Sequence, residues 1–252
     1  MQIYKQALRF QEIASGVFVQ RIPARYLKRL YNAQGNDPVV QALRNLDNIF
    51  AECKRKDVDM VSSLEAVLDE FEHDRASAGA VLLAWSMSFD AERKVMNEPR
   101  LVGITTLSCF AFTSNFSTDS ESLSSGDQAK LRPYVGRWMY MDGMCSTQPG
   151  VGRLLVMHAF QYAIAHKKQG LIALSYSMRR SAVPESKRIF AALNFDTVIP
   201  QANFKIQMYG TWFAKSTADV GLAGMAEAAV GVCTRTGFTP KTADTLMWRC
   251  PL

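Results

Sequence analysis

The feature that most constrains the fold is a predicted helix between two predicted strands, with two glycines at its start. Residues 134–145 (YVGRWMYMDGMC) indicate a strand, and residues 171–178 (LIALSYSM) indicate a short buried strand. Between them, residues 146–168 (STQPGVGRLLVMHAFQYAIAHKK) repeat apolar side chains at steps of three and four. This spacing predicts a helix with one buried face. The three segments together predict a β-α-β unit whose strands are parallel.

Gly150 and Gly152 stand where this helix begins. The first turn of a helix leaves several N–H groups without partners, and the helix dipole makes that end attractive to anions. Glycines at this place let a bulky anion such as a pyrophosphate approach the backbone. The alternative is a turn that only begins a core helix, and the two glycines alone do not decide between them.

The rest of the chain predicts a mixed sheet with helices in one domain. A buried strand at 78–89 and a β-branched strand at 100–112 are expected to pair antiparallel. A Ser-rich exposed loop is expected at 113–128, and Gly170 is expected to end the helix that begins at the two glycines. Further elements follow: a helix at 184–193 with Asn194 as its left-handed cap, a strand at 204–215, a helix at 218–238 and a strand at 245–250. We divide the chain into a helical portion (1–77), a core (78–215) and a completing C-terminal portion (216–252).

Composition and charge narrow the class of protein. Hydrophobic residues make up 48% and charged residues 21%, as in ordinary soluble proteins, and no apolar run approaches a membrane span. The start of the chain lacks the apolar core of a secretory signal, so we expect a cytoplasmic protein without a membrane partner. The five cysteines have no paired spacing, which favours buried free thiols over a disulfide framework or a metal site.

The net charge of +6 is uneven. From Lys130 to Lys215 there are twelve basic and three acidic residues, a balance of +9; from Asp57 to Glu98 there are three basic and ten acidic residues, a balance of −7. An anionic cofactor or a nucleic acid would be attracted to the basic half. The alternative is that these residues are only solvated.

Three segments resemble the GCN5-related N-acetyltransferase (GNAT) superfamily, over roughly residues 78–215. RLVGITTL (100–107) is similar to the family's third strand, with Val102-Gly103 at its usual place. QPGVGRLLV (148–156) is similar to the acyl-CoA pyrophosphate loop, and SKRIFAALNF (186–195) to a later helix. The resemblance implies an α/β (α+β) fold: a mixed, mostly antiparallel sheet with a central, splayed parallel strand pair and flanking helices.

The resemblance also implies an acetyl-CoA (or other acyl-CoA) site at the glycine loop. Its expected residues are Met144, Thr147, Gly150, Val151, Gly152, Arg153 and Leu154. Thr147 replaces the family's Arg or Gln, and Pro149 removes one N–H. Phe190 stands where many members carry the tyrosine that protonates the departing thiolate, so that role is empty or filled elsewhere.

GNAT enzymes transfer an acyl group by direct attack of an amine on a thioester, which needs groups that handle protons. Asp142 could take the proton of the amine, and it could equally cap a turn. Tyr176 is the expected substitute acid, with Tyr140 and Ser175 nearby; a packed aromatic is the alternative for Tyr176. No metal is expected.

The acceptor and the oligomeric state are open. The primary expectation is an N-acyltransferase acting on an amine. A thin likeness to phage Mom-type proteins suggests DNA bases as an alternative substrate, with Arg179, Arg180, Lys187 and Arg188 as phosphate contacts. A third alternative is a catalytically inactive GNAT-fold binding module, favoured by Phe190 and Pro149.

Overall fold

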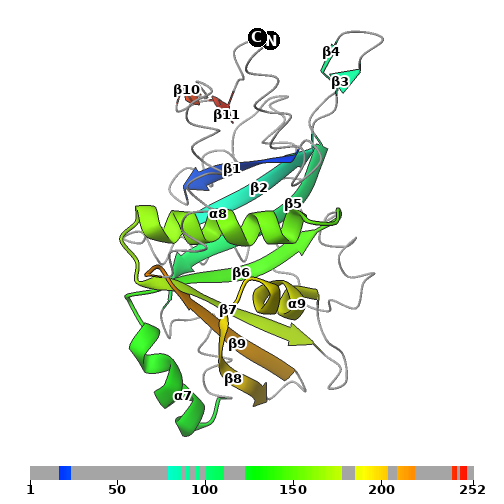
Figure 1. Cartoon of the computed structure of the whole chain (residues 1–252). Helices are drawn as coiled ribbons and strands as arrows, with labels where there is room; N and C mark the ends of the chain where they lie inside the picture. Colours follow the sequence, from blue (N-terminus) through cyan, green and yellow to red (C-terminus); the bar gives the residue numbers. More distant parts are fainter. Residues whose placement is uncertain are drawn as a thin grey trace.

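The described part of the chain is built around one seven-stranded sheet with helices on both faces (Figure 1). This computed structural model describes residues 17–23, 79–86, 89–90, 95–96, 100–110, 123–177, 185–203, 209–218, 240–242 and 245–248. The expected helix at 218–238, the helices expected within 24–77 and the loop residues 113–122 lie outside these ranges.

The strand order of the sheet is β1-β2-β5-β6-β7-β9-β8. The strands are β1 (Val17–Pro23), β2 (Ala80–Ser86), β5 (Arg100–Cys109), β6 (Met139–Ser146), β7 (Gly170–Ser177), β8 (Asp196–Asn203) and β9 (Tyr209–Ser216). In this sheet β6 and β7 pair parallel, and every other neighbouring pair is antiparallel. Two short hairpins join β3 (Phe89–Asp90) to β4 (Val95–Met96) and β10 (Pro240–Thr242) to β11 (Thr245–Trp248). The mixed, mostly antiparallel sheet with a central parallel pair is therefore confirmed.

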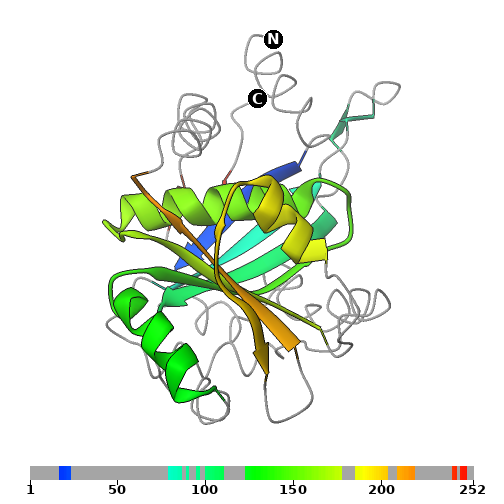
Figure 2. The ribbon, with the colours of Figure 1, turned by 60° about the horizontal axis from the view of Figure 1, so that its bottom comes forward.

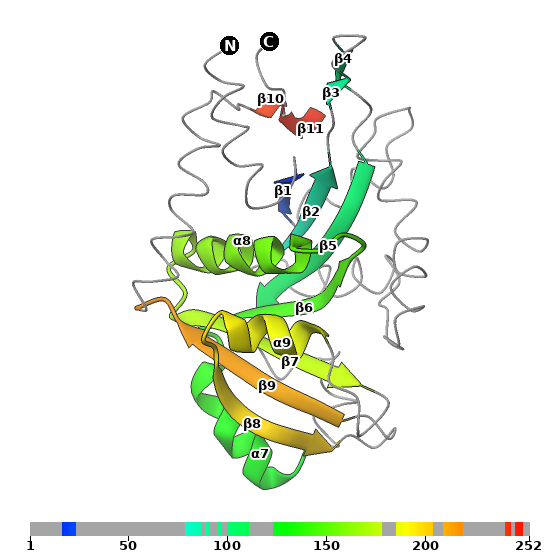
Figure 3. The same ribbon diagram turned by 45° about the vertical axis from the view of Figure 1, so that its right-hand side comes forward.

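The helices divide between the two faces of the sheet. Helices α8 (Val151–Ala165) and α9 (Glu185–Ala192) pack on one face, and α7 (Ser125–Leu131), followed by the short 3-10 helix η1 (Arg132–Tyr134), packs on the other (Figure 3). Seen from below, α8 lies across the strands (Figure 2). Successive side chains of a strand face opposite sides, so Met139 and Met141 join the α8 cluster while Tyr140 joins the α7 cluster.

Helix α8 confirms the helix expected from the apolar spacing, but it ends earlier than expected. It stops at Ala165 with His166 as its cap, and Gly170 is the first residue of β7. The reason for a glycine at 170 is steric: a Cβ there would lie 2.1 Å from the Trp138 ring and 2.5 Å from the carbonyl oxygen of Lys215. Gly170 thus allows the backbone of β7 to pass close to its neighbours.

Helix α9 ends as the sequence predicts. Asn194 has φ of 55°, in the left-handed region that asparagine tolerates. The N–H of Phe195 returns to the carbonyl of Phe190 at 3.0 Å. The Nζ of Lys215, a residue only 4% exposed, donates to the carbonyl of Asn194 at 3.0 Å. A cation at this end of a helix is favourable because the dipole is negative there.

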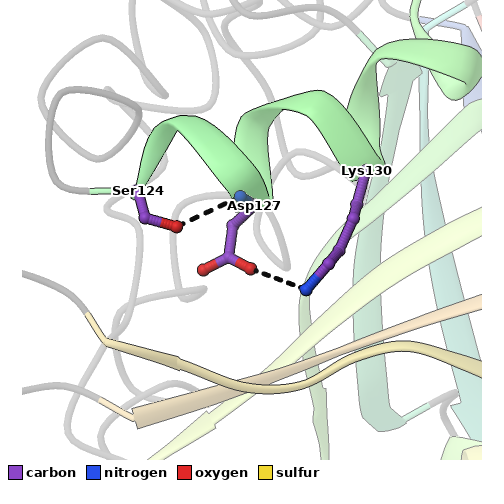
Figure 4. Close-up of polar contacts among 3 residues, drawn as sticks. All are labelled: Ser124, Asp127 and Lys130. Carbon is purple, nitrogen blue, oxygen red and sulfur yellow. Dashed lines mark hydrogen bonds and ion pairs between the residues drawn. The ribbon is translucent and has the colours of Figure 1, made fainter.

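Three described elements differ from the expectation. Residues 17–23 were expected to be helical and form the edge strand β1; residues 196–203 form the unpredicted strand β8. The expected loop at 113–128 gives way to α7 from Ser125 onward. The hydroxyl of Ser124 accepts from the N–H of Asp127 at 3.1 Å, and Lys130 bridges to Asp127 at 3.2 Å (Figure 4). These contacts cap the first turn and stabilise a short helix.

The cysteines differ in part from the expected free thiols. Cys109 is free, as expected. Cys145, which is 5% exposed, is disulfide-bonded, and its partner is not among the described residues. The expectation of a free thiol is therefore wrong for Cys145. In the part of the chain that the structure describes, no helix is long and apolar enough to cross a membrane.

Candidate active site

The start of α8 lies directly after β6 and is set by glycine geometry. Gly150, the N-cap, has φ of 83° and contributes no side-chain cap. This left-handed conformation favours glycine over any residue with a Cβ. Val151, the first helical residue, is fully buried against β5. A Cβ on Gly103 of β5 would lie 2.6 Å from the Cγ1 of Val151. The glycine at 103 is therefore what lets α8 begin close to the sheet.

The N–H groups around this turn fall into two sets. Thr147 donates both its N–H (2.9 Å) and its hydroxyl (3.3 Å) to the carbonyl of Val102. The N–H of Val151 bonds to Gln148 at 3.4 Å, and that of Leu154 bonds to Gly150 at 3.1 Å. Among the described residues, the N–H groups of Gly150, Gly152 and Arg153 have no such acceptor. The N–H groups that are free to bind an anion at this turn are therefore those of Gly150, Gly152 and Arg153.

Gly152 lies where the start of α8 comes close to α9 and to the end of β6. A Cβ on it would lie 2.8 Å from Cδ1 of Ile189 on α9, 3.5 Å from Oγ of Ser146 and 3.7 Å from Sδ of Met144. The side chain of Arg153 is exposed beside these amides. Unpaired amides, a positive helix end and an exposed guanidinium are the features that bind phosphate groups in proteins.

The parallel strands β6 and β7 part just before this turn. They pair only from Met139↔Leu171 to Met141↔Ala173. In β6, Asp142 opposes Thr106 and Cys145 opposes Ile104, so β6 carries one extra residue, a β-bulge. A bulge bends its strand. Beyond it, β6 continues along β5, while β7 follows β9, and in the views of Figures 1 and 3 the two strands diverge above and below α9. The facing backbone edges of β6 and β7 are not paired with each other there.

A hydroxyl pair lies on the diverging part of β7. Ser175, 3% exposed, is two residues beyond the last paired position, and its Oγ lies 2.7 Å from Oγ of Ser186. Ser186 is in the first turn of α9. Ser175 was among the expected site residues; Ser186 was not. A serine next to a Pro-Glu helix start was the available signal, but its contact depends on how α9 packs on β7.

The remaining expected catalytic residues have different surroundings. Asp142 and Tyr176 occupy the diverging segments of β6 and β7, but their side chains lie outside what the structure describes. Tyr140 is 5% exposed, with its ring 5.8 Å from Phe110 and 5.9 Å from Trp212. This aromatic cluster favours a packing role for Tyr140.

Phe190, which the sequence resemblance places at the position of a GNAT tyrosine, belongs to the core. It is 2% exposed, and its ring lies 5.1 Å from Phe195 and stacks on Phe213 at 5.4 Å. A phenyl ring donates no proton, so this side chain cannot serve as an acid. On the same helix as Phe190, the hydroxyl of Ser186 pairs with that of Ser175 on β7.

The expected nucleic-acid contacts are only partly described. Lys187 is half-buried and Arg188 exposed, both on α9, while Arg179 and Arg180 lie outside the described residues. Within the described ranges, no group of three or more His, Cys, Asp or Glu side chains could hold a metal ion.

Comparisons with known proteins find similarity in fold and none in sequence. Neither a protein-family model nor a curated protein matches the chain. Among solved structures, yncA of Salmonella typhimurium, which is assigned as an acetyltransferase and was solved with its cofactor acetyl-CoA, is similar. The two share 10% identity over 81% of this chain and 95% of that chain, with a TM-score of 0.45.

Two further structures are similar to the same extent. The ribosomal-protein-alanine N-acetyltransferase of Brucella melitensis shares 12% identity over 79% of this chain and 99% of that chain, with a TM-score of 0.44. A spermidine/spermine N-acetyltransferase, SpeG of Vibrio cholerae, shares 9% identity over 81% of this chain and 95% of that chain, with a TM-score of 0.43. At such identities the likeness concerns the fold alone. The mixed sheet and its parting parallel pair agree with the GNAT-type fold expected from the sequence.

Proposed function

We propose that the protein is an acyl-CoA-dependent N-acyltransferase, which moves an acyl group, acetyl in the simplest case, to an amine. The observation that carries the proposal is that two sets of backbone groups without hydrogen-bond partners among the described residues lie next to each other. The free amides of Gly150, Gly152 and Arg153 begin α8, and the parted edges of β6 and β7 lie directly before it. An extended ligand with a phosphate group at one end suits both.

The residues present fit such a ligand. The absent Cβ at Gly152 keeps open the space beside the free amides, where a side chain would meet Ile189 and Ser146. Bound acyl-CoA would supply a thioester carbonyl open to attack by an amine. The amides at the start of α8 and the guanidinium of Arg153 would hold its pyrophosphate through charge-assisted hydrogen bonds. The free edges of β6 and β7 would bond an extended arm, as sheet edges bond added strands.

Proton handling falls to groups on the diverging strands. The Ser175–Ser186 pair is mostly shielded from water and can donate one hydroxyl proton outward while the other hydroxyl supports it. It can therefore stabilise or protonate a departing thiolate in the role that Phe190 cannot fill. Asp142 remains the proposed acceptor of the proton from the amine, on the strength of its place on β6 just before the bulge.

A catalytically inactive binding module is the second candidate, and the burial of Phe190 favours it. The ring is built into the core, so the side chain at the place of the family's usual proton donor supplies no proton. This candidate predicts that acyl-CoA binds without release of free CoA in the presence of any amine.

The test is a melting experiment with and without acetyl-CoA, together with an assay for CoA thiol release. At a ligand concentration a hundredfold above Kd, binding stabilises by about 2.7 kcal/mol, or roughly 5–10 °C in Tm for a protein of this size. Arg153→Glu should remove most of this shift, and because Arg153 is exposed, the variant should fold normally. Gly152→Asp, which adds a carboxylate among the amides, should remove it as well.

Gly126→Asp is the matched control for charge. Gly126 lies on α7, where an added Cβ meets nothing closer than 3.8 Å. This variant should keep the full shift with acetyl-CoA. Equal shifts for Gly126→Asp and Arg153→Glu would show that the start of α8 does not bind the ligand. A shift without thiol release would favour the binding module.

A further inference from the structure

A thiol and an amine from distant parts of the sequence meet at the opposite end of β6 from the glycine turn. Cys109, the last residue of β5, pairs with Met139, the first residue of β6. The Nζ of Lys168 lies 3.0 Å from the Sγ of Cys109. Both groups also contact the carbonyl oxygen of Gly136, at 3.2 Å from Nζ and 3.4 Å from Sγ.

The backbone on each side of this contact is fixed. The N–H of Lys168 bonds to Ala163 at 2.9 Å, and its carbonyl accepts the Thr217 hydroxyl at 3.0 Å. Gly136, with φ of 72°, donates its N–H to Phe110 at 2.7 Å. The backbone of the lysine is thus held by the turn after α8, and its Nζ contacts Cys109 and Gly136 from there.

The ammonium of Lys168 has no carboxylate partner among the described residues. Its described partners are the sulfur of Cys109 and one carbonyl. Both residues are half-buried, so small reagents can reach them. Lys167, one residue earlier, is exposed and on the same turn. Lys168 therefore presents its amine to a free thiol and to one carbonyl, without an ion-pair partner among the described residues.

We infer that Cys109 and Lys168 form an acyl-relay site, at which an acyl group from a thioester is taken up by the cysteine and passed to the lysine. The sulfur of Cys109 attacks the carbonyl carbon of an acyl thioester, the C–S bond of that thioester breaks, and the proton of the Cys109 thiol passes to the thiolate that leaves. The product is an acyl thioester on Cys109. Lys168 gives one proton to water, and its amine nitrogen then attacks the new carbonyl. The C–S bond to Cys109 breaks, a proton from the attacking nitrogen passes to the Cys109 sulfur, which leaves as a thiol, and an amide remains on Lys168.

Proximity makes the second step fast. With Nζ 3.0 Å from Sγ, the carbonyl carbon of a thioester on Cys109 comes within reach of the amine, close to the roughly 3–3.5 Å of a reactive arrangement. Such intramolecular reactions have effective concentrations far above those of a free lysine in solution. The product amide is neutral, so acylation also removes the ammonium that holds the carbonyl of Gly136.

This inference does not depend on the proposed acyltransferase. The thioester comes from solution, and the site lies at the other end of β6 from the turn that is proposed to bind acyl-CoA. The two proposals share a reagent but no residue, and each can fail alone.

The test is incubation of the folded protein with acetyl-CoA, followed by peptide mass spectrometry of the two neighbouring lysines. Lys168 should acetylate at least about tenfold faster than Lys167, which serves as the internal control on the same turn. In Cys109→Ala, Lys168 should slow to the rate of Lys167. In Lys168→Arg, the acetyl group should remain on Cys109 and be released by hydroxylamine.

Other outcomes would overturn the relay. Equal rates for Lys167 and Lys168 in the wild type, or an unchanged rate for Lys168 in Cys109→Ala, would exclude a role for the thiol. Cys109→Ser is a second variant that keeps a hydrogen-bonding group in place of the thiol, and it should also lose the fast acetylation of Lys168. Arg153→Glu should leave the relay unchanged, which separates it from the acyl-CoA site.

Discussion

Protonation of a single buried histidine should control much of the stability of this protein between pH 7 and 5. His158 lies on α8 and is 3% exposed, and neither of its ring nitrogens has a hydrogen-bond partner. Burial, with a smaller contribution from the nearby positive charge of Arg21, lowers its pKa to about 3. The ring is therefore neutral in the folded protein at any pH above about 4.

The sign of the effect follows from the two pKa values. In the unfolded chain His158 titrates near its ordinary pKa of 6.5, so below that pH the unfolded state binds a proton that the folded state does not. Stability is complete above pH 6.5 and falls as the pH decreases toward 3. Each unit of pH contributes about 1.36 kcal/mol, so the step from 6.5 to 5 removes about 2 kcal/mol. This figure hardly changes for any folded pKa below about 4.

The assay is urea unfolding at pH 7 and pH 5 for the wild type and His158→Leu. The variant lacks the titrating ring and also two unsatisfied buried nitrogens, so it should lose about 2 kcal/mol less than the wild type over this pH step. Carboxylates contribute equally to both proteins and cancel in the comparison. His166→Gln is the control, because His166 is exposed; it should keep most of the wild-type difference.

Equal losses of stability for the wild type and His158→Leu would refute the reasoning. They would mean that the ring of His158 is protonated in the folded state at pH 5 and finds a partner or water there.

Three other variants test separate parts of the structure. Gly170→Ala should destabilise by roughly 1–3 kcal/mol in urea unfolding, because its Cβ would meet a tryptophan ring and a backbone carbonyl, whereas Gly126→Ala should be neutral or stabilising; equal stabilities of the two variants would contradict this packing. Ser186→Ala should lower kcat by roughly a hundredfold with little change in the KM for acyl-CoA; an unchanged kcat would remove the hydroxyl pair from the mechanism. Lys187→Ala with Arg188→Ala should flatten the salt dependence of duplex binding by about one unit per lost phosphate contact if the acceptor is DNA, and identical slopes would exclude these two residues as contacts.

The centre of the fold was predictable because its local signals agree. Apolar spacing gave the helix at 151–165, and the buried run after it gave a parallel strand. Asn194 was expected to adopt a left-handed conformation, and it does. Val102-Gly103 was recognised from the family pattern, and the structure gives its physical reason, which is the close approach of Val151. Positions of this kind depend on the backbone geometry of a few neighbouring residues.

The edges of the sheet were harder to predict because their sequences are ambiguous. Strand β8 (DTVIPQAN) contains Pro200, which argues against a central strand but is tolerated at an edge. Strand β1 is a short run between segments with helical patterns, and only its pairing with β2 decides its conformation. For α7 a signal was present and not used, since Ser124 and Asp127 form the spacing of a capped helix start.

The place of the site was predictable from the sequence, but the individual amides and hydroxyls that are available in it were not. The glycine turn was expected to offer a run of amides, yet Thr147, Val151 and Leu154 use theirs within the chain. Which amides remain free depends on the strand that Thr147 reaches, 45 residues earlier. The contact between Ser175 and Ser186 likewise depends on how α9 packs against β7. Contacts of this kind depend on tertiary packing, which the local sequence does not determine.

The central claim is that the free amides at the start of α8 bind the pyrophosphate of acyl-CoA. Its most direct test is the amide proton chemical shift of Gly152 and Arg153 in the isotope-labelled protein, with acetyl-CoA and with acetyl-pantetheine, which lacks the pyrophosphate. Saturating acetyl-CoA should move both resonances downfield, as new hydrogen bonds to phosphate oxygens require, while acetyl-pantetheine leaves them in place. The same two resonances unmoved by acetyl-CoA at saturation, or moved equally by both compounds, would contradict the claim.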